Sequence, residues 1–209
     1  MAGPATAGDG PVGRWALQPL SEPAPNATGA VRILFRDECL VAAHKPSGVA
    51  VHRSTFVGAA PVMLQALRDA LGQFVYTVHR LDRSTSGLIL FALSRASAQV
   101  LCEQFREQRV AKTYLAVVRG WPPAEGVVDH PVPTASGKLR QEAVTAYRRL
   151  ATAEVPVPCG PYASSRYALL ELQPHHGRYH QLRRHMKHIS HPIIGDTDSG
   201  DSRHNRLFR

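Results

Sequence analysis

Alternating apolar and polar positions predict a β-hairpin where regular patterning begins. The runs VRILF (31–35) and LVAAH (40–44) lie on either side of a polar triplet, and the turn-forming segment KPSG (45–48) follows. A short helix is then predicted from about Pro61, since proline is tolerated in the first turn of a helix. Its apolar positions recur at helical spacing, at Met63, Leu64, Leu67, Ala70 and Leu71.

The middle of the chain continues this mixture of strands and helices. The β-rich runs FVYTV (74–78) and GLILFAL (87–93) flank a polar loop. A helix is predicted from about Ser94 to Gln108, with Ser94 as its N-cap and one apolar face. The later predictions are strands over 113–120, about 142–150 and about 166–172, then a helix over 179–189. Strands outnumber helices without β-α-β alternation, which favours an α+β fold.

Composition separates a tail from a folded region. Residues 1–28 are rich in Ala, Gly and Pro, and we expect a flexible tail in which Trp15 and Leu17 dock weakly. The chain has 209 residues and a net charge of +9. The tail holds one basic and two acidic residues, so the basic excess belongs to residues 29–209, expected to form one domain. Such a charge points to a polyanionic partner.

Cysteine usage and hydropathy indicate the compartment. Cys39, Cys102 and Cys159 are far apart and odd in number, which argues against a disulfide framework or a zinc cluster. The N-terminus lacks the basic and apolar regions of a signal peptide. The longest apolar stretch, 88–93, is too short for a membrane helix. We therefore expect a cytoplasmic protein that does not bind a membrane.

The loop HRLDRSTSG (79–87) contains a single carboxylate, Asp82, with arginine on both sides. Guanidinium groups favour the ionised carboxylate, which suits a nucleophile better than a general acid. A structural ion pair, or a polar turn ended by Gly87, accounts for the same pattern. P-loop, dinucleotide-binding, zinc-protease and nucleophile-elbow motifs are absent from the sequence.

The predicted helix over 179–189 has an apolar and a basic stripe. The apolar stripe consists of Tyr179, Leu182, Met186 and Ile189, and the basic one of His180, Arg183, Arg184 and Lys187. The basic stripe suits phosphate groups, or it is an ordinary solvated face. His185, His188 and His191 raise a metal site as an alternative, although neutral histidines in a basic RNA groove explain the cluster equally well.

The strand KTYLAVVRG (112–120) places Lys112 and Tyr114 on one face. Tyrosine commonly stacks on unpaired bases in RNA recognition. Packing of a half-buried strand tyrosine on the core is the alternative interpretation.

Taken together, HRLDRSTSG, AKTYLAVVRG and GRYHQLRRHMKHISHPIIGD closely resemble the RluA-type family of pseudouridine synthases, from about Val31 to Arg209. KPSGVAVHRS, ATAEVPVPCGPYASSRYALLEL, the doubled arginine and the ending GDSRHNRLFR resemble the branch that modifies uridine-65 of tRNA. The resemblance implies a mixed, largely antiparallel central sheet with flanking helices. It also implies an isomerase that acts as a monomer on tRNA without cofactor, nucleotide or metal.

The resemblance assigns roles to individual residues. Asp82 matches the catalytic nucleophile, which attacks C6 of the uracil or C1′ of the sugar. Arg80 matches the arginine that holds the flipped nucleotide, and Tyr114 the tyrosine that packs on the uracil and assists removal of the C5 proton. Arg183 matches the basic residue that pairs with the aspartate. The further expected RNA-binding residues are Lys112, Arg178, His180 and Arg184.

The sequence departs from the family pattern at two points, and two alternative functions remain open. His44 replaces the usual asparagine of the NKPSG segment, and family members continue beyond Arg209 with a further apolar strand. We therefore expect the domain to be incomplete at its C-terminus, with an exposed sheet edge. Ribosomal RNA is an alternative substrate for the same chemistry, and a non-catalytic RNA-binding protein is an alternative of another class.

Overall fold

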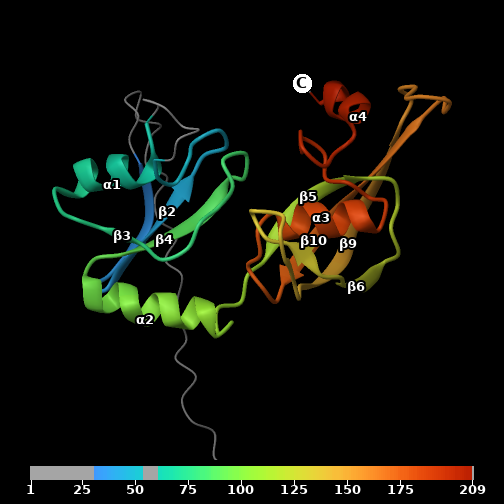
Figure 1. The fold of residues 1–209 in the computed structure, drawn as a ribbon. Coiled ribbons are helices and arrows are strands. Elements are labelled where there is room, and N and C mark those ends of the chain that lie inside the picture. The colour runs from blue at the N-terminus through green and yellow to red at the C-terminus, as the bar shows by residue number, and fades with distance from the viewer. Residues whose placement is uncertain (1–30, 54–60, 209) are drawn as a thin grey trace, which may run out of the picture.

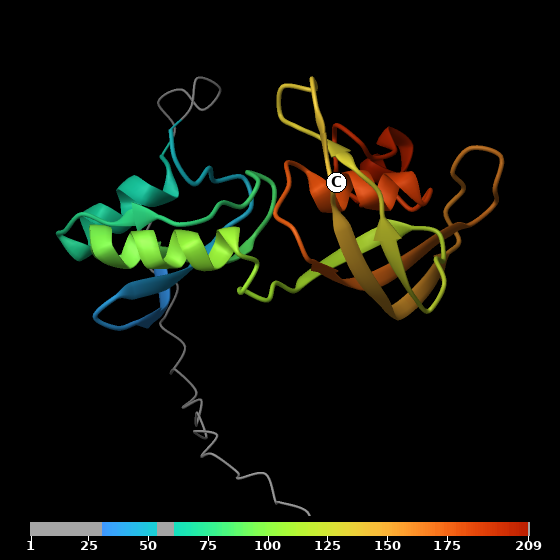
Figure 2. The ribbon, with the colours of Figure 1, turned by 60° about the horizontal axis from the view of Figure 1, so that its bottom comes forward.

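The computed structural model describes residues 31–53 and 61–208. They form two lobes that lie side by side and are joined by the segment after α2 (Figures 1 and 2). The first lobe runs to residue 109 and the second from 114. The predicted tail over 1–28, with Trp15 and Leu17, lies outside the described residues.

The first lobe contains a four-stranded antiparallel sheet in the order β1-β2-β4-β3. Its elements are β1 (Arg32–Arg36), β2 (Leu40–Lys45), α1 (Met63–Leu71), β3 (Tyr76–Thr77), β4 (Gly87–Ala92) and α2 (Arg95–Arg106). The predicted hairpin and both predicted helices are present. Gly72 adopts a left-handed conformation after α1 and ends it, whereas the Ser94 side chain caps α2 by accepting a hydrogen bond from the Ser97 amide at 3.0 Å.

The second lobe contains another four-stranded antiparallel sheet, in the order β5-β10-β9-β6. Its elements are β5 (Tyr114–Arg119), β6 (Glu125–Asp129), β7 (Val132–Pro133), β8 (Arg140–Gln141), β9 (Val144–Val155), β10 (Ser165–Pro174), α3 (Gln181–His188) and α4 (Ser202–Leu207). The strand predicted over 142–150 extends to Val155 because it pairs with the whole of β10. The predicted helix over 179–189 begins only at Gln181, so Tyr179 is not on its apolar face.

Each lobe has its own hydrophobic core. Val41, Ile89 and Phe91 are fully buried in the first lobe, and Leu170 and Met186 in the second. Tyr114, at the start of β5, packs against both cores. The junction between the lobes is therefore packed around a residue that the sequence singles out for function.

The predicted α+β class with antiparallel strand pairing is confirmed, with the strands divided between two principal sheets. Among the described residues, no helix is long and apolar enough to cross a bilayer.

Candidate active site

Asp82 lies in the loop between β3 and β4, at the edge of the first lobe that faces the second. The preceding residue, Leu81, is buried in the first core, so the next side chain points away from that core. A turn closed by the hydrogen bond from the Thr85 amide to the Asp82 carbonyl, 3.0 Å, fixes the loop. The Asp82 side chain retains 27% exposure and faces the cavity between the lobes.

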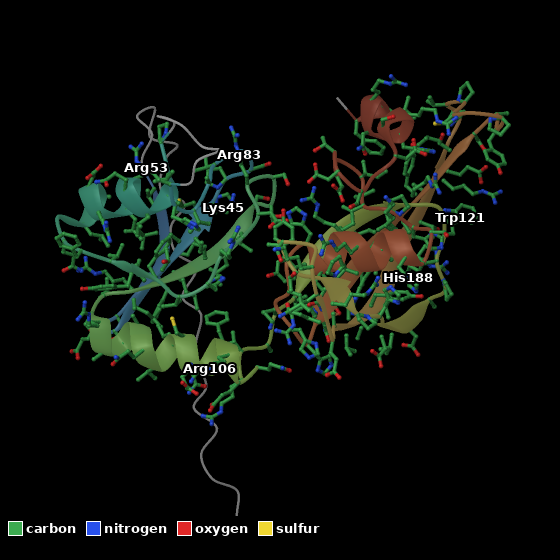
Figure 3. The ribbon with its side chains drawn as sticks, in the orientation of Figure 1. Lys45, Arg53, Arg83, Arg106, Trp121 and His188 are labelled. Atoms are coloured by element: carbon green, nitrogen blue, oxygen red, sulfur yellow. The ribbon has the colours of Figure 1, made fainter. Side chains whose placement is uncertain are left out.

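Lys45 joins this loop to the KPSG segment from inside the first lobe. Its side chain is fully buried at the end of β2. The ammonium group donates to the carbonyl oxygens of Pro46, Val49 and Arg83 at 3.0, 2.7 and 3.1 Å. Burial lowers the pKa of Lys45, and the charge of Asp82 opposes that shift. Figure 3 shows Lys45 close to Arg83 in the part of the lobe that faces its neighbour.

Three further hydrogen bonds connect the same two segments. Gly48 and Arg83 exchange a reciprocal pair, from the Gly48 amide to the Arg83 carbonyl and from Arg83 Nε back to the Gly48 carbonyl, both 2.8 Å. The Ser47 hydroxyl donates to the Ser84 carbonyl at 2.8 Å. The Arg83 guanidinium therefore serves the backbone rather than Asp82, contrary to what its adjacency in the sequence suggests.

The side-chain partners of Asp82 come from the second lobe. Arg183 Nη1 lies 3.4 Å, and His180 Nε2 3.6 Å, from Asp82 Oδ2. The other terminal nitrogen of Arg183 contacts Asp196 and Asp198, the latter at 2.9 Å. The hydrogen bond to Asp196 raises the pKa of Arg183 and outweighs the opposing effect of burial. The negative charges of the three carboxylates raise this pKa further. The guanidinium thus remains charged and is oriented with one nitrogen toward Asp82.

Asp196 is the buried anchor of this arrangement. Its Oδ1 also accepts hydrogen bonds from the Asp198 and Ser199 amides, at 3.0 and 3.1 Å. Asn205 of α4 grips the same loop by accepting from the Gly195 amide at 2.8 Å and donating to the Asp196 carbonyl at 2.7 Å. Burial alone would raise the pKa of Asp196, but its hydrogen bonds lower it overall. Asp196 therefore remains ionised against Arg183.

The backbone at the start of α3 is arranged around His180. His180 has a left-handed conformation, φ 52°, and its ring stacks on that of Tyr179 with centroids 3.8 Å apart. Gln181 holds this entry in place, because its buried side chain accepts from the Arg178 amide at 3.1 Å and donates to the Val144 carbonyl at 3.0 Å. Burial lowers the pKa of His180, assisted by Arg183 and opposed by Asp82. The neutral imidazole can accept a hydrogen bond from Arg183.

Tyr114 and Lys112 approach the cavity from the segment that links the lobes. Burial, and then the charge of Asp82, raises the pKa of Tyr114, so its phenol stays protonated near neutral pH. Lys112 Nζ donates to the His175 carbonyl at 3.3 Å, and burial lowers the pKa of Lys112.

Both lobes line one cavity of about 810 Å³, which is large enough for a nucleotide. Seven of the eight predicted site residues face it, namely Arg80, Asp82, Lys112, Tyr114, Arg178, His180 and Arg183. Arg184 does not face it. Its guanidinium donates to the Pro133 carbonyl and lies 5.1 Å from the centre of the Tyr179 ring. The predicted basic stripe is thus divided between intramolecular contacts and solvent.

The three clustered histidines make different contacts and do not converge on one point. His185 is buried between the Thr145 hydroxyl and the His130 carbonyl, each at 2.9 Å. His188 stacks on His130, whereas His191 contacts the Arg119 carbonyl at 2.8 Å. Within the part of the chain that the structure describes, no three metal-ligating side chains come together.

Sequence reasoning did not select Lys45, Gln181 or Asp196, although all three lie within the motifs quoted above. The KPSG turn and the HQLRRH and IIGD segments contained the signal. Their roles depend on contacts with distant backbone and with Arg183.

The comparisons with known proteins agree with this geometry. The family model described as RNA pseudouridylate synthase matches residues 39–188. The chain belongs to the RNA pseudouridylate synthase family. The matched segment includes Asp82, Tyr114 and Arg183, which line the cavity, and Lys45, which supports the Asp82 loop.

Named relatives within the family are similar over most of this chain. A tRNA pseudouridine synthase C of Pectobacterium carotovorum subsp. carotovorum is 52% identical over 187 residues, which are 84% of this chain and 50% of that protein. A protein of the same name from Vibrio parahaemolyticus is 46% identical over 190 residues, 86% of this chain and 77% of that protein. The chain thus spans half the length of the first relative.

Solved structures of the family share the fold. Human RNA Pseudouridylate Synthase Domain Containing 1 superposes with a TM-score of 0.70 at 26% identity, covering 88% of this chain and 76% of that one. Human RNA Pseudouridylate Synthase Domain Containing 4 gives a TM-score of 0.63 at 31% identity, covering 83% and 70%.

Replacing Lys45 by methionine tests the connection between the two loops. The variant leaves three carbonyl oxygens without their charged donor, so we expect it to lower the free energy of unfolding by about 1–3 kcal/mol in urea titrations. The exposed Lys138→Met is the matched control, with a change within about 0.5 kcal/mol. Equal stability of the two variants would refute the role of Lys45.

His79 gives a prediction for pH. Its Nε2 accepts from the Leu90 amide at 2.9 Å and its ring stacks on Phe105, and burial, with Lys112 assisting, lowers the pKa of His79 to about 4. The native state therefore favours the neutral ring. The resulting stabilisation is complete above the unfolded pKa near 6.5 and is lost as pH falls toward 4.

Between pH 7 and 4.5 this loss amounts to about 2–3 kcal/mol. Urea unfolding of wild type and His79→Gln at both pH values isolates it, with a smaller decrease expected in the variant. Identical decreases in the two proteins would contradict the assignment.

Proposed function

We propose that the protein is an isomerase that converts a specific uridine of tRNA into pseudouridine, with Asp82 as the nucleophile. The observation that supports it most directly is the arrangement of three carboxylates around Arg183. Asp196 and Asp198 occupy one terminal nitrogen of the guanidinium, whereas Asp82 faces a nucleotide-sized cavity from the other. Asp82 is thus the carboxylate of this group that is positioned for attack.

The reaction needs one exposed carboxylate and no redox change. Asp82 attacks C6 of the uracil or C1′ of the ribose, and the bond between C1′ and N1 breaks. The uracil turns within the cavity and C5 bonds to C1′. The bond between Asp82 and C6 or C1′ breaks, which restores the free carboxylate, and the C5 proton leaves while N1 gains a proton. Product and substrate are isomers, so the proposed chemistry requires no cofactor or metal.

The second-lobe residues assist this sequence. Arg183, 3.4 Å from Asp82 Oδ2, orients the carboxylate toward the substrate before attack. Tyr114 packs against the uracil, and its protonated phenol relays the C5 proton. The phenol oxygen accepts the proton from C5 while the hydroxyl group gives up the proton that it already holds. Arg80 is exposed at the mouth of the cavity, where it supports the flipped nucleotide.

Charge supports RNA as the partner. Extruding a base from a stem costs a few kcal/mol, and phosphate contacts offset that cost. The net charge of +9 supplies such contacts. The names of the relatives specify tRNA, and we propose uridine-65 as the target, in the cytoplasm, for a monomeric enzyme. Ribosomal RNA is the alternative substrate.

Asp82→Asn tests the nucleophile. The amide keeps the shape of the side chain but attacks poorly, so release of tritium from RNA containing 5-tritiated uridine is expected to fall by about 1,000-fold or more. Asp69→Asn, on the exposed face of α1, is the matched control and retains wild-type release. Undiminished release by Asp82→Asn eliminates the assigned nucleophile. A wild-type protein that binds RNA but releases no tritium is instead a passive binder.

Mapping the product tests the substrate. Unmodified tRNA transcripts and ribosomal RNA fragments are incubated with the protein, and pseudouridine is located by sequencing after chemical labelling. A gain at position 65 of tRNA alone is the expected result. A gain confined to ribosomal RNA would overturn the tRNA assignment while preserving the chemistry.

A further inference from the structure

A second, smaller cavity of about 350 Å³ adjoins the Asp82 cavity. Six residues line both cavities, including Arg80, Lys112 and Tyr114. The smaller one also has walls of its own, provided by His79 and by Phe105, Arg106 and Gln108 near the end of α2. Figure 3 shows Arg106 on α2, toward the end that leads into the second lobe. A polymer lying in the Asp82 cavity can therefore continue directly into this second space.

The charged residues that line the smaller cavity are all basic. Arg80, Arg106, Lys112 and Arg178 contribute four positive charges, and no carboxylate lines it. Among the described residues, Lys112 and Arg178 donate to the carbonyl oxygens of His175 and Glu142, which carry no charge to neutralise them. Within residues 31–53 and 61–208, Arg80 has no hydrogen-bond or ion-pair partner. These cations are therefore available to bind an anion that enters the cavity.

Arg106 is available to join the other three cations. Its partner is Glu103, one turn away on the exposed face of α2. Such surface pairs contribute little free energy, so an anion in the cavity can compete for the guanidinium.

The remaining wall is aromatic. The His79 and Phe105 rings stack with centroids 4.6 Å apart, and the Leu90 amide holds the His79 ring in the neutral form. A neutral, flat wall beside four cations suits a group with an anionic and an apolar part, and the volume fits one nucleotide.

We propose that this cavity binds the phosphodiester of a nucleotide that flanks the target uridine, with its sugar or base against Phe105 and its phosphate among Arg80, Arg106, Lys112 and Arg178. The inference rests on the proposed function, since it names the part of the RNA that this region takes. It assigns Arg106, outside the three motifs, to substrate binding. The subsite anchors the strand next to the flipped nucleotide, while Asp82 acts on the flipped nucleotide itself.

The test is a binding cycle between single protein charges and single RNA phosphates. Lys112→Met and Arg106→Gln are made in the Asp82→Asn background, which stops turnover. Each is titrated with a tRNA T-arm stem-loop and with copies that have one neutral methylphosphonate at successive positions around the target. Lys187→Met and Arg95→Gln, exposed residues that line neither cavity, are matched controls.

Removing one charged phosphate contact is expected to weaken binding of the unmodified stem-loop by about tenfold. Both site variants should bind every modified RNA about tenfold more weakly than the parent does, with one exception. The exception is the RNA whose methylphosphonate lies next to the target uridine. With that RNA the variants and the parent should bind equally. Urea unfolding verifies that each variant is folded, and the two site variants must identify the same phosphate.

An equal loss across all RNA positions, or a loss no larger than in the controls, overturns the subsite. Tritium release distinguishes failure of the subsite from failure of the proposed function. Tritium release without coupling to one phosphate preserves the enzyme and removes the subsite. Coupling to one phosphate in a protein that releases no tritium removes the isomerase and leaves a specific RNA contact.

Discussion

The ion pair between Asp82 and Arg183 spans 101 residues of sequence and joins the two lobes, and the site depends on it. Neither lobe has the site alone, because the carboxylate belongs to the first and its cationic partner to the second. Each side is held by its own lobe. The buried Lys45 holds the Asp82 loop through the Arg83 carbonyl. Asp196, whose carbonyl accepts a hydrogen bond from Asn205 of α4, fixes the orientation of Arg183. Each partner of the ion pair is therefore oriented by hydrogen bonds within its own lobe.

The electrostatics of the site follow from how Arg183 is shared. One guanidinium serves three carboxylates, of which Asp196 is almost fully buried and Asp198 largely exposed. Water screens the attraction between Arg183 and the buried Asp196 less than that between Arg183 and the exposed Asp198. Asp82 is partly exposed, and its Oδ2 lies 3.4 Å from Arg183 Nη1, which makes it the most distant of the three carboxylates from the guanidinium. Its side chain faces the cavity. A carboxylate that is held loosely beside a cavity can move to attack a substrate.

Local patterning accounts for much of the fold prediction. The hairpin β1–β2, helices α1 and α2 and the long strands were predictable because their periodicity is local. Strand β6 and helix α4 were not, since the first is a short strand defined by pairing with β9 and the second has few apolar positions. The start of α3 also depended on distant contacts, because Gln181 fixes it by bonding to β9.

The sequence by itself determined the chemistry available: a lone carboxylate in an arginine-rich loop, a tyrosine after Lys112, a basic segment near residue 183 and a net charge of +9. These are local facts of residue type and spacing. Residue type and spacing did not decide which arginine pairs with Asp82, and only the family resemblance pointed to Arg183. In the tertiary structure Arg83 bonds to Gly48, while Arg183 reaches Asp82 from the other lobe. Only the tertiary structure decided that Lys45 is buried and that a second cationic cavity exists. Partner choice among like charges depends on distances through space, which spacing along the chain does not encode.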